Sequence, residues 1–153
     1  MTTSRKFSRL ILPALMTLGI VASTGAGAEP AAALSIKTYN ADGNSFHVNA
    51  VVVSGKREAV VIDTGFTRAD ALRVAANVLD SGKTLKAIFI SNAEPDFYFG
   101  AEVLKGLFPQ AQVLTTPAVR EKIQAKLAAK VAFWGPKMGA NAPQQPVLPD
   151  LLS

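Results

Sequence analysis

Hydrophobic and polar positions alternate in the early part of the chain as they do in β-strands. Residues 34–39 alternate strictly, which predicts a half-buried strand. Residues 46–53 are more continuously apolar, and the turn-like segment 54–57 separates them from a second apolar run over 58–62. This pattern predicts a β-hairpin with one well-buried strand.

After residue 65 the spacing of the apolar residues becomes helical. Thr67 and Asp70 have the spacing of a capping box, and Gly82 stands where a left-handed C-terminal stop would fall. A helix is therefore expected over about 68–80. Its apolar face is expected to contain Leu72, Ala75, Ala76 and Leu79.

Strands and helices continue to alternate further along the chain. A buried strand is expected over 85–90, a short helix over about 99–107 and a strand over 112–115. Thr116 and Pro117 are typical of the cap and first residue of a longer helix. Its buried positions are expected to be Val119, Ile123, Leu127 and Val131. The alternation favours an α/β layer fold.

The two ends of the chain differ from this central part. Residues 1–28 have a basic start, an apolar run over 10–22 and a small-residue site at 26–28, which together indicate a secretory signal peptide. The apolar run is shorter than the ~20 residues that a helical membrane span needs. We therefore expect a periplasmic or secreted protein with no membrane anchor after cleavage. Residues 29–135 are expected to form one domain, and the Pro- and Gly-rich residues 136–153 an irregular tail.

Charge and composition restrict the possible partners and metals. The formal net charge of +5 includes three basic residues of the signal peptide and falls to +2 without them, so a nucleic-acid partner is not expected. The chain has no cysteine and a single histidine, His47. A metal ion would therefore need Asp, Glu, Asn or His47 as ligands. His47 lies in a predicted strand far in sequence from the acidic residues, so we expect no catalytic role for it.

The candidate chemistry lies in the loop that follows the strand over 85–90. Asn92, Glu94 and Asp96 place oxygen-bearing side chains at alternate positions, a pattern that suits a hard divalent cation such as Mg²⁺, Ca²⁺ or Mn²⁺. The structural alternative is that Asp96 caps the next helix and that Glu94 is solvated. The basic residues of the last helix, Lys130 among them, are interpreted as a solvated face. Trp134 is expected to close the end of that helix against the sheet.

The order of elements resembles the opening half of the metallo-β-lactamase fold. The resemblance rests on Val-Ile-Asp-Thr-Gly at 61–65, which closes a hairpin, and on the strand, loop and helix that follow. Exported hydrolase-like members have motifs similar to Tyr-Phe-Gly at 98–100 and Phe-Trp-Gly-Pro-Lys at 133–137. The similarity spans about residues 36–149. It implies an αββα sandwich, of which this chain would supply one half: a mixed sheet with helices packed on one face.

The resemblance also implies a zinc-dependent hydrolase site, in a loop with the pattern His-x-His-x-Asp-His. Asn92 and Glu94 replace the first two histidines, Asp96 is retained, and Phe97 replaces the last histidine. Imidazole is the donor that suits zinc, so we expect the usual dinuclear centre not to assemble. Asp96 remains the candidate catalytic residue. In the family, the Asp-Thr-Gly turn, here Asp63, Thr64 and Gly65, supports the metal loop through hydrogen bonds.

Three functional hypotheses follow. The first is a hydrolase-like protein with a degraded metal site, weak or inactive as a hydrolase and possessing an unknown small-molecule ligand or substrate. The second is an active hydrolase of an ester, lactone or phosphoester that uses a hard cation on Glu94 and Asp96. The third is an interaction module, because a half-sandwich leaves a sheet face uncovered and would associate with itself or with a second half-domain chain. A truncated reading frame would have the same appearance.

Overall fold

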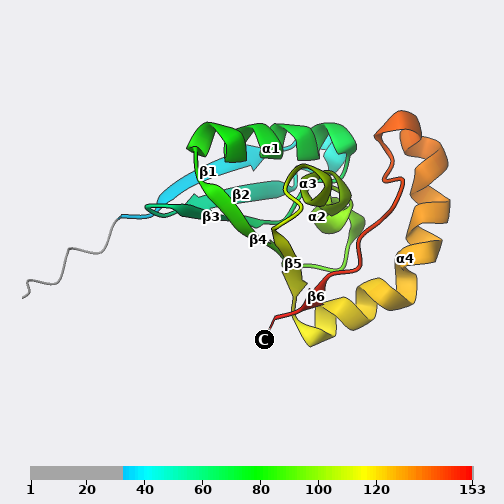
Figure 1. Cartoon of the computed structure of the whole chain (residues 1–153). Helices are drawn as coiled ribbons and strands as arrows, with labels where there is room; N and C mark the ends of the chain where they lie inside the picture. The colour runs from blue at the N-terminus through cyan, green and yellow to red at the C-terminus, as the bar shows by residue number, and fades with distance from the viewer. Residues whose placement is uncertain (1–32, 153) are drawn as a thin grey trace, which may run out of the picture. The chain divides into compact units, whose positions relative to one another are not determined.

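The computed structural model describes residues 33–152, in which six strands form one mixed sheet with the spatial order β1-β2-β3-β4-β5-β6 (Figure 1). The first three strands are antiparallel neighbours, whereas β3, β4, β5 and β6 run parallel. The strands are β1 Ser35–Asn40, β2 Asn49–Ser54, β3 Glu58–Ile62, β4 Thr84–Ile90, β5 Gln112–Thr115 and β6 Asp150–Leu151. The predicted signal peptide lies outside the described residues.

Helices join the parallel strands and pack on the sheet. They are α1 Arg68–Ser81, α2 Pro95–Tyr98, α3 Ala101–Leu107 and α4 Pro117–Met138, with short 3-10 turns η1 Gly43–Ser45 and η2 Gly139–Asn141. The α/β class with a mixed sheet is therefore confirmed. None of the helices in this part of the chain has the length and hydropathy that a membrane span requires.

The start and end of α1 follow the predicted capping chemistry. The Asp70 backbone N–H donates to Thr67 Oγ1 at 3.0 Å, and the Thr67 N–H donates to Asp70 Oδ2 at 3.0 Å, which completes a capping box. Gly82 has a φ of 63°, the left-handed conformation that ends many helices.

The buried face of α1 differs from the prediction. Leu72 and Leu79 are 53% and 66% exposed, whereas the stripe of Ala71, Val74, Ala75 and Val78 is buried. The short side chains let α1 approach its neighbours closely: a Cβ at Gly100 would lie only 2.8 Å from the Ala71 Cβ. The larger leucines are therefore excluded from this interface.

Other elements also depart from the sequence prediction. The short helix is divided into α2 and α3, and it begins at Pro95 rather than at Phe99. The strand predicted to be half-buried, β1, is exposed except at Tyr39 because it forms the edge of the sheet. In α4 only Ile123 is fully buried, while the other three predicted positions are partly buried against the core.

The expected irregular tail over 136–153 contains regular structure. Helix α4 continues past Pro136 to Met138, and the Gly139 N–H donates to the Gly135 carbonyl to close its last turn. Strand β6 then pairs with β5, and the Leu152 N–H donates to the Thr115 carbonyl at 2.9 Å. Edge pairing uses backbone groups, so it leaves no periodic signal in the sequence.

The two faces of the sheet differ in burial. Alternate residues such as Val52, Val61 and Ile88 are buried in the core against the helices. Figure 1 shows α1 over one side of β1, β2 and β3, and no helix of residues 33–152 over the other side of these strands. That second face carries half-buried apolar side chains, namely Val51, Val53, Val60, Ile62, Ala87, Phe89 and Leu114.

Candidate functional site

The candidate site forms where the neighbouring parallel strands β3 and β4 end. Asp63 follows β3, and its carboxylate accepts hydrogen bonds from the Ser91 N–H at 2.8 Å and from Ser91 Oγ at 2.7 Å. Ser91 is the first residue after β4. Asp63 therefore ties together the two loops at this edge of the sheet, the usual position of sites in α/β folds.

Thr64 and Gly65 add further ties between the same loops. The Thr64 N–H and Oγ1 both donate to the Phe97 carbonyl, at 2.9 and 3.0 Å, and the Gly100 N–H donates to the Gly65 carbonyl at 3.1 Å. Gly65 has a φ of 85°, and a Cβ there would lie 2.6 Å from the Asp70 Cβ. The turn therefore requires glycine at this position. The Asp-Thr-Gly turn thus holds the segment that contains the candidate residues.

Asp63 is buried and its backbone is strained. Its φ of 59° is in the left-handed region that only Asn, Asp and Gly adopt readily. Burial raises the pKa of Asp63, the hydrogen bonds from Ser91 oppose that rise, and the negative charge of Asp96 adds to it. The ionised form of Asp63 is thus electrostatically unfavourable, although the residue has a structural role.

The three residues of the predicted metal loop do not all converge: Glu94 and Asp96 line one cavity, and Asn92 does not. Asn92 is exposed, and its Oδ1 accepts the Glu94 N–H at 3.1 Å in a local turn. Glu94 forms an ion pair with Lys130 of α4, with Oε2 2.5 Å from Nζ. Asp96 lies in the first turn of α2 and is half-buried.

The structural alternative is wrong for Asp96 and holds in part for Glu94. Glu94, not Asp96, occupies the N-cap position of α2, and no side chain caps that helix. Glu94 is exposed, as expected, but it is also paired with Lys130, so Lys130 does not belong to a purely solvated basic face.

Glu94 and Asp96 open into a cavity with aromatic walls. The cavity measures about 310 Å³ and is lined by Phe46, Phe66, Glu94, Pro95, Asp96, Lys130 and Trp134. The rings of Phe46, Phe66 and Trp134 meet edge to face, with centroids 5.2 to 5.7 Å apart. Trp134, expected only to close a helix end, thus also forms a wall of this cavity.

The cavity perturbs the ionisation of Asp96. Burial raises the pKa of this carboxyl, and the negative charge of Glu94 raises it further, while Lys130 acts in the opposite direction. Its own backbone N–H also favours the ionised form and acts to lower the pKa, and no other residue among 33–152 donates a hydrogen bond to the Asp96 carboxylate. A half-buried carboxylate without a side-chain hydrogen bond therefore lines a cavity that also contains three aromatic rings.

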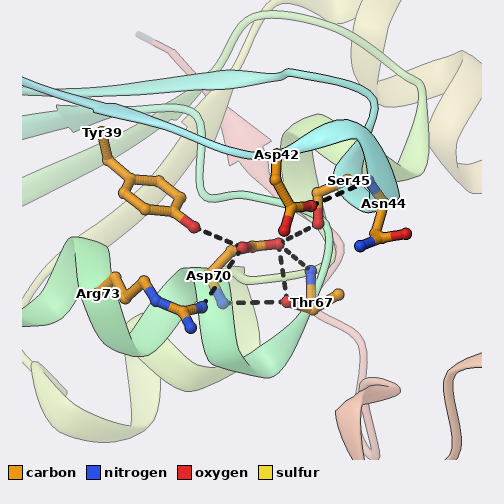
Figure 2. A network of polar contacts seen from close by, with 7 residues as sticks. All are labelled: Tyr39, Asp42, Asn44, Ser45, Thr67, Asp70 and Arg73. Carbon is orange, nitrogen blue, oxygen red and sulfur yellow. Dashed lines mark hydrogen bonds and ion pairs between the residues drawn. The ribbon is translucent and has the colours of Figure 1, made fainter.

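A polar network beside the cavity fixes the loop that carries Phe46. Figure 2 shows Tyr39 and Ser45 directed at the carboxylate of Asp70, and each hydroxyl donates to it at 2.6 Å. Thr67 Oγ1 donates at 2.7 Å, and the Arg73 guanidinium lies 3.7 Å away. Asp70 thus connects β1, the η1 turn and α1.

This network also sets the ionisation of Asp70. Burial acts to raise the pKa of this carboxyl, but the hydrogen bonds from Ser45, Tyr39 and Thr67 outweigh burial and hold the pKa below its usual value. Phe46 and His47 follow Ser45 with φ values of 58° and 55°. The anchored Ser45 keeps Phe46 at the cavity despite this strained backbone.

Sequence reasoning missed Phe46 and Phe66 as wall residues and Lys130 as the partner of Glu94. Phe46 precedes its strand and lies in a turn, and Lys130 is 36 residues from Glu94, so no local motif joins them. His47 does not line the cavity, and its imidazole lies beside Gly43.

The side chains at the loop do not meet the needs of a zinc ion. Within residues 33–152, no three side chains of His, Cys, Asp or Glu form a group that could hold a metal. At the loop, the Asn92 oxygen is engaged by a backbone N–H and Glu94 by an ammonium group. These residues provide no imidazole, the donor that suits zinc, and they do not fit the ion.

A larger groove of about 600 Å³ lies away from the strand-end loops, between α1 and α3. Its most engaged residue is Glu102, which accepts from Arg68 at 3.1 Å and from the Gln144 and Gln145 N–H groups at 2.6 and 2.7 Å. Glu102 therefore has a structural role: it holds the segment after η2 against α3.

The mixed sheet, the helices on one face and the strand-end site define a metallo-β-lactamase-like half-sandwich. The sequence model of the metallo-beta-lactamase superfamily matches residues 43–136, which is more than half of the chain. The chain therefore belongs to this superfamily.

Solved structures show the same fold. The BLEG-1 B3 metallo-beta-lactamase is similar with a TM-score of 0.56 and 19% identity, over 78% of this chain and 53% of its own. The metallo-beta-lactamase from Hirschia baltica is similar with a TM-score of 0.50 and 16% identity, over 61% and 43%. The chain thus spans about half the length of these structures. No curated protein matches it.

Proposed function

We propose that this chain is an exported metallo-β-lactamase-fold protein that binds a small molecule in the aromatic cavity and is weak or inactive as a metal-dependent hydrolase. The observation that supports this proposal is the ion pair between Glu94 and Lys130 at 2.5 Å. The lysine ammonium engages the carboxylate of Glu94, the residue at a position where the family resemblance places a metal ligand. Without a bound metal ion, water stays a weak nucleophile at neutral pH.

Metal analysis of the purified chain tests this proposal. The protein is equilibrated with excess zinc, dialysed and analysed for metal content, beside the Asp96→Ala variant. We expect far less than one zinc per chain, with no difference between the two proteins. Stoichiometric zinc that is lost in the Asp96→Ala variant would overturn the proposal.

A restored loop provides the matched control. The triple variant Asn92→His, Glu94→His, Phe97→His has three imidazoles on the same scaffold, and we expect it to gain zinc affinity. Equal zinc content in the native chain and the triple variant would show that the side chains at these positions do not decide metal binding.

The alternative of a hard-cation hydrolase draws on the fact that Glu94 and Asp96 line one cavity. It requires turnover of an ester, lactone or phosphoester that depends on Mg²⁺ or Mn²⁺ and is lost in Asp96→Asn. We favour the binding role because the cavity offers a hard cation only the carboxylates of Glu94 and Asp96, and Glu94 is already paired with Lys130.

A second candidate function is self-association through the uncovered sheet face. Seven half-buried apolar side chains from β2 to β5 share this face, and two apolar sheet faces pack well against each other. A second copy of the chain presents an identical face and would form a symmetric dimer. Light scattering should then show a dimer that Val60→Asp converts to a monomer; a native monomer would contradict this candidate.

A further inference from the structure

The aromatic cavity combines two features that attract the same kind of ligand. Phe46, Phe66 and Trp134 provide ring surfaces, and the faces of such rings carry partial negative charge that attracts cations. Glu94 and Asp96 line the same space and provide carboxylates that attract cations as well. Its volume of about 310 Å³ is in the range of small-molecule sites.

The charges around the cavity do not cancel. Lys130 is the one cation among the lining residues, and its ammonium group is engaged by Glu94 at 2.5 Å. No side chain in the described part of the chain forms a hydrogen bond or an ion pair with Asp96, and Lys130 acts on it only as a nearby charge. When both carboxylates are ionised, the cavity therefore carries one excess negative charge, located on Asp96.

Other ligand classes suit this arrangement less well. A divalent metal ion needs an oxygen shell that phenyl and indole rings do not provide. An organic anion would meet two carboxylates and one lysine that is already paired. A neutral apolar molecule would remove water from Asp96 without replacing its hydrogen bonds.

We propose that the cavity binds a small organic ammonium ion, with its N–H donor on the Asp96 carboxylate and its apolar substituent among Phe46, Phe66 and Trp134. This inference rests on the proposed ligand-binding function and names the class of ligand. The charge-assisted hydrogen bond gives orientation, and burial of the apolar substituent against the rings gives affinity.

Trp134 is the only tryptophan of the chain, so indole fluorescence reports directly on the cavity wall. The purified full chain is titrated with phenethylammonium, and with phenethyl alcohol and phenylacetate as neutral and anionic analogues. We expect saturable quenching or a spectral shift with phenethylammonium and at least about tenfold weaker binding of the two analogues. Equal binding of the alcohol, tighter binding of phenylacetate, or no binding of any of the three would each overturn the inference.

Variants test the two charged partners separately. Asp96→Asn should weaken phenethylammonium binding about tenfold, because it removes the charge from the acceptor. Lys130→Met should strengthen binding about fivefold, because it removes a competing cation. Lys126→Met, one turn earlier on α4 and exposed, is the matched control and should leave the affinity unchanged. Unchanged affinity in Asp96→Asn, with the fold verified by circular dichroism, would contradict the assigned contact.

The inference and the proposed function can fail independently. If the chain binds neither zinc nor phenethylammonium, the inference of an ammonium site is wrong, but the proposal that the metal centre is lost still holds. If the chain binds stoichiometric zinc at Asp96, the proposed function itself is wrong.

Discussion

At the scale of single residues, Gly100 marks the closest approach between the two loops of the site. A Cβ at this position would lie 2.3 Å from the Thr64 carbonyl oxygen. Gly106, near the end of α3, is in open surroundings, because a Cβ there would meet no atom within 4 Å. The packing therefore requires glycine at position 100 but not at position 106.

Gly100→Ala should destabilise the protein by about 3 kcal/mol or prevent folding, because the new methyl group forces the backbone of Thr64 to move. Gly106→Ala should instead stabilise it by about 0.5 to 1 kcal/mol, since the site is open and helical. Urea denaturation of both variants measures the difference. Similar stability of the two variants would contradict the tight contact between the loops.

The raised pKa of Asp96 predicts how the stability of the protein depends on pH. A carboxyl group with a raised pKa in the folded state stabilises folding most below its unfolded pKa and loses that contribution as the pH rises through the folded pKa. The charged form of Asp96 is therefore unfavourable at neutral pH. Asp96→Asn should raise the melting temperature by a few degrees at pH 7, and the gain should disappear below about pH 4. The exposed Asp80→Asn is the control and should change the melting temperature little.

At the scale of elements, the Asp70 network joins β1, the η1 turn and α1. Asp70→Asn should cost about 2 kcal/mol at neutral pH, because charge-assisted hydrogen bonds from Tyr39, Ser45 and Thr67 are weakened. The pKa of Asp70 is lowered in the folded state. The stability it provides is thus present above the unfolded pKa and is lost as the pH falls through the folded pKa.

Chemical denaturation of the native chain and of Asp70→Asn over a series of pH values measures this dependence. The difference in stability should be constant from neutral pH down to about pH 4 and should shrink in stronger acid. A difference that grows on acidification would contradict the network.

The elements themselves are largely predictable, because their signals are local. The capping box of Thr67 and Asp70, Gly82 at the end of α1, and Pro117 at the start of α4 each lie within a few residues of the boundary that they determine. The buried face of α1 is less predictable. Ala71 is buried and Leu72 is exposed because α1 lies close to Gly100, and the sequence alone does not give the distance between these elements.

The candidate site is predictable only at its acidic loop. Asn92, Glu94 and Asp96 are alternate polar positions after a strand, whereas Phe46, Lys130 and Trp134 come from elements far from that loop in the sequence. Their meeting depends on the path of α4 and on the anchoring of the loop that carries Phe46. These tertiary relations have no sequence period, so the ion pair of Lys130 with Glu94 could not be inferred from the sequence.

At the scale of the whole molecule, the proposed export can be tested by measuring the mass of the processed protein. If residues 1–28 are removed as a signal peptide, the mature protein begins at Glu29. Mass spectrometry of the protein expressed with its natural N-terminus, recovered from a periplasmic extract, should give the mass of residues 29–153. A cytoplasmic product that retains residues 1–28 would contradict export.

The proposed loss of the metal centre is tested most directly by anomalous X-ray scattering at the zinc absorption edge, from crystals soaked in dilute zinc. We predict no occupied zinc position within bonding distance of Asn92, Glu94 or Asp96, and an intact contact between Lys130 and Glu94. A fully occupied zinc ion bound to Asp96, with Lys130 displaced, would contradict this prediction.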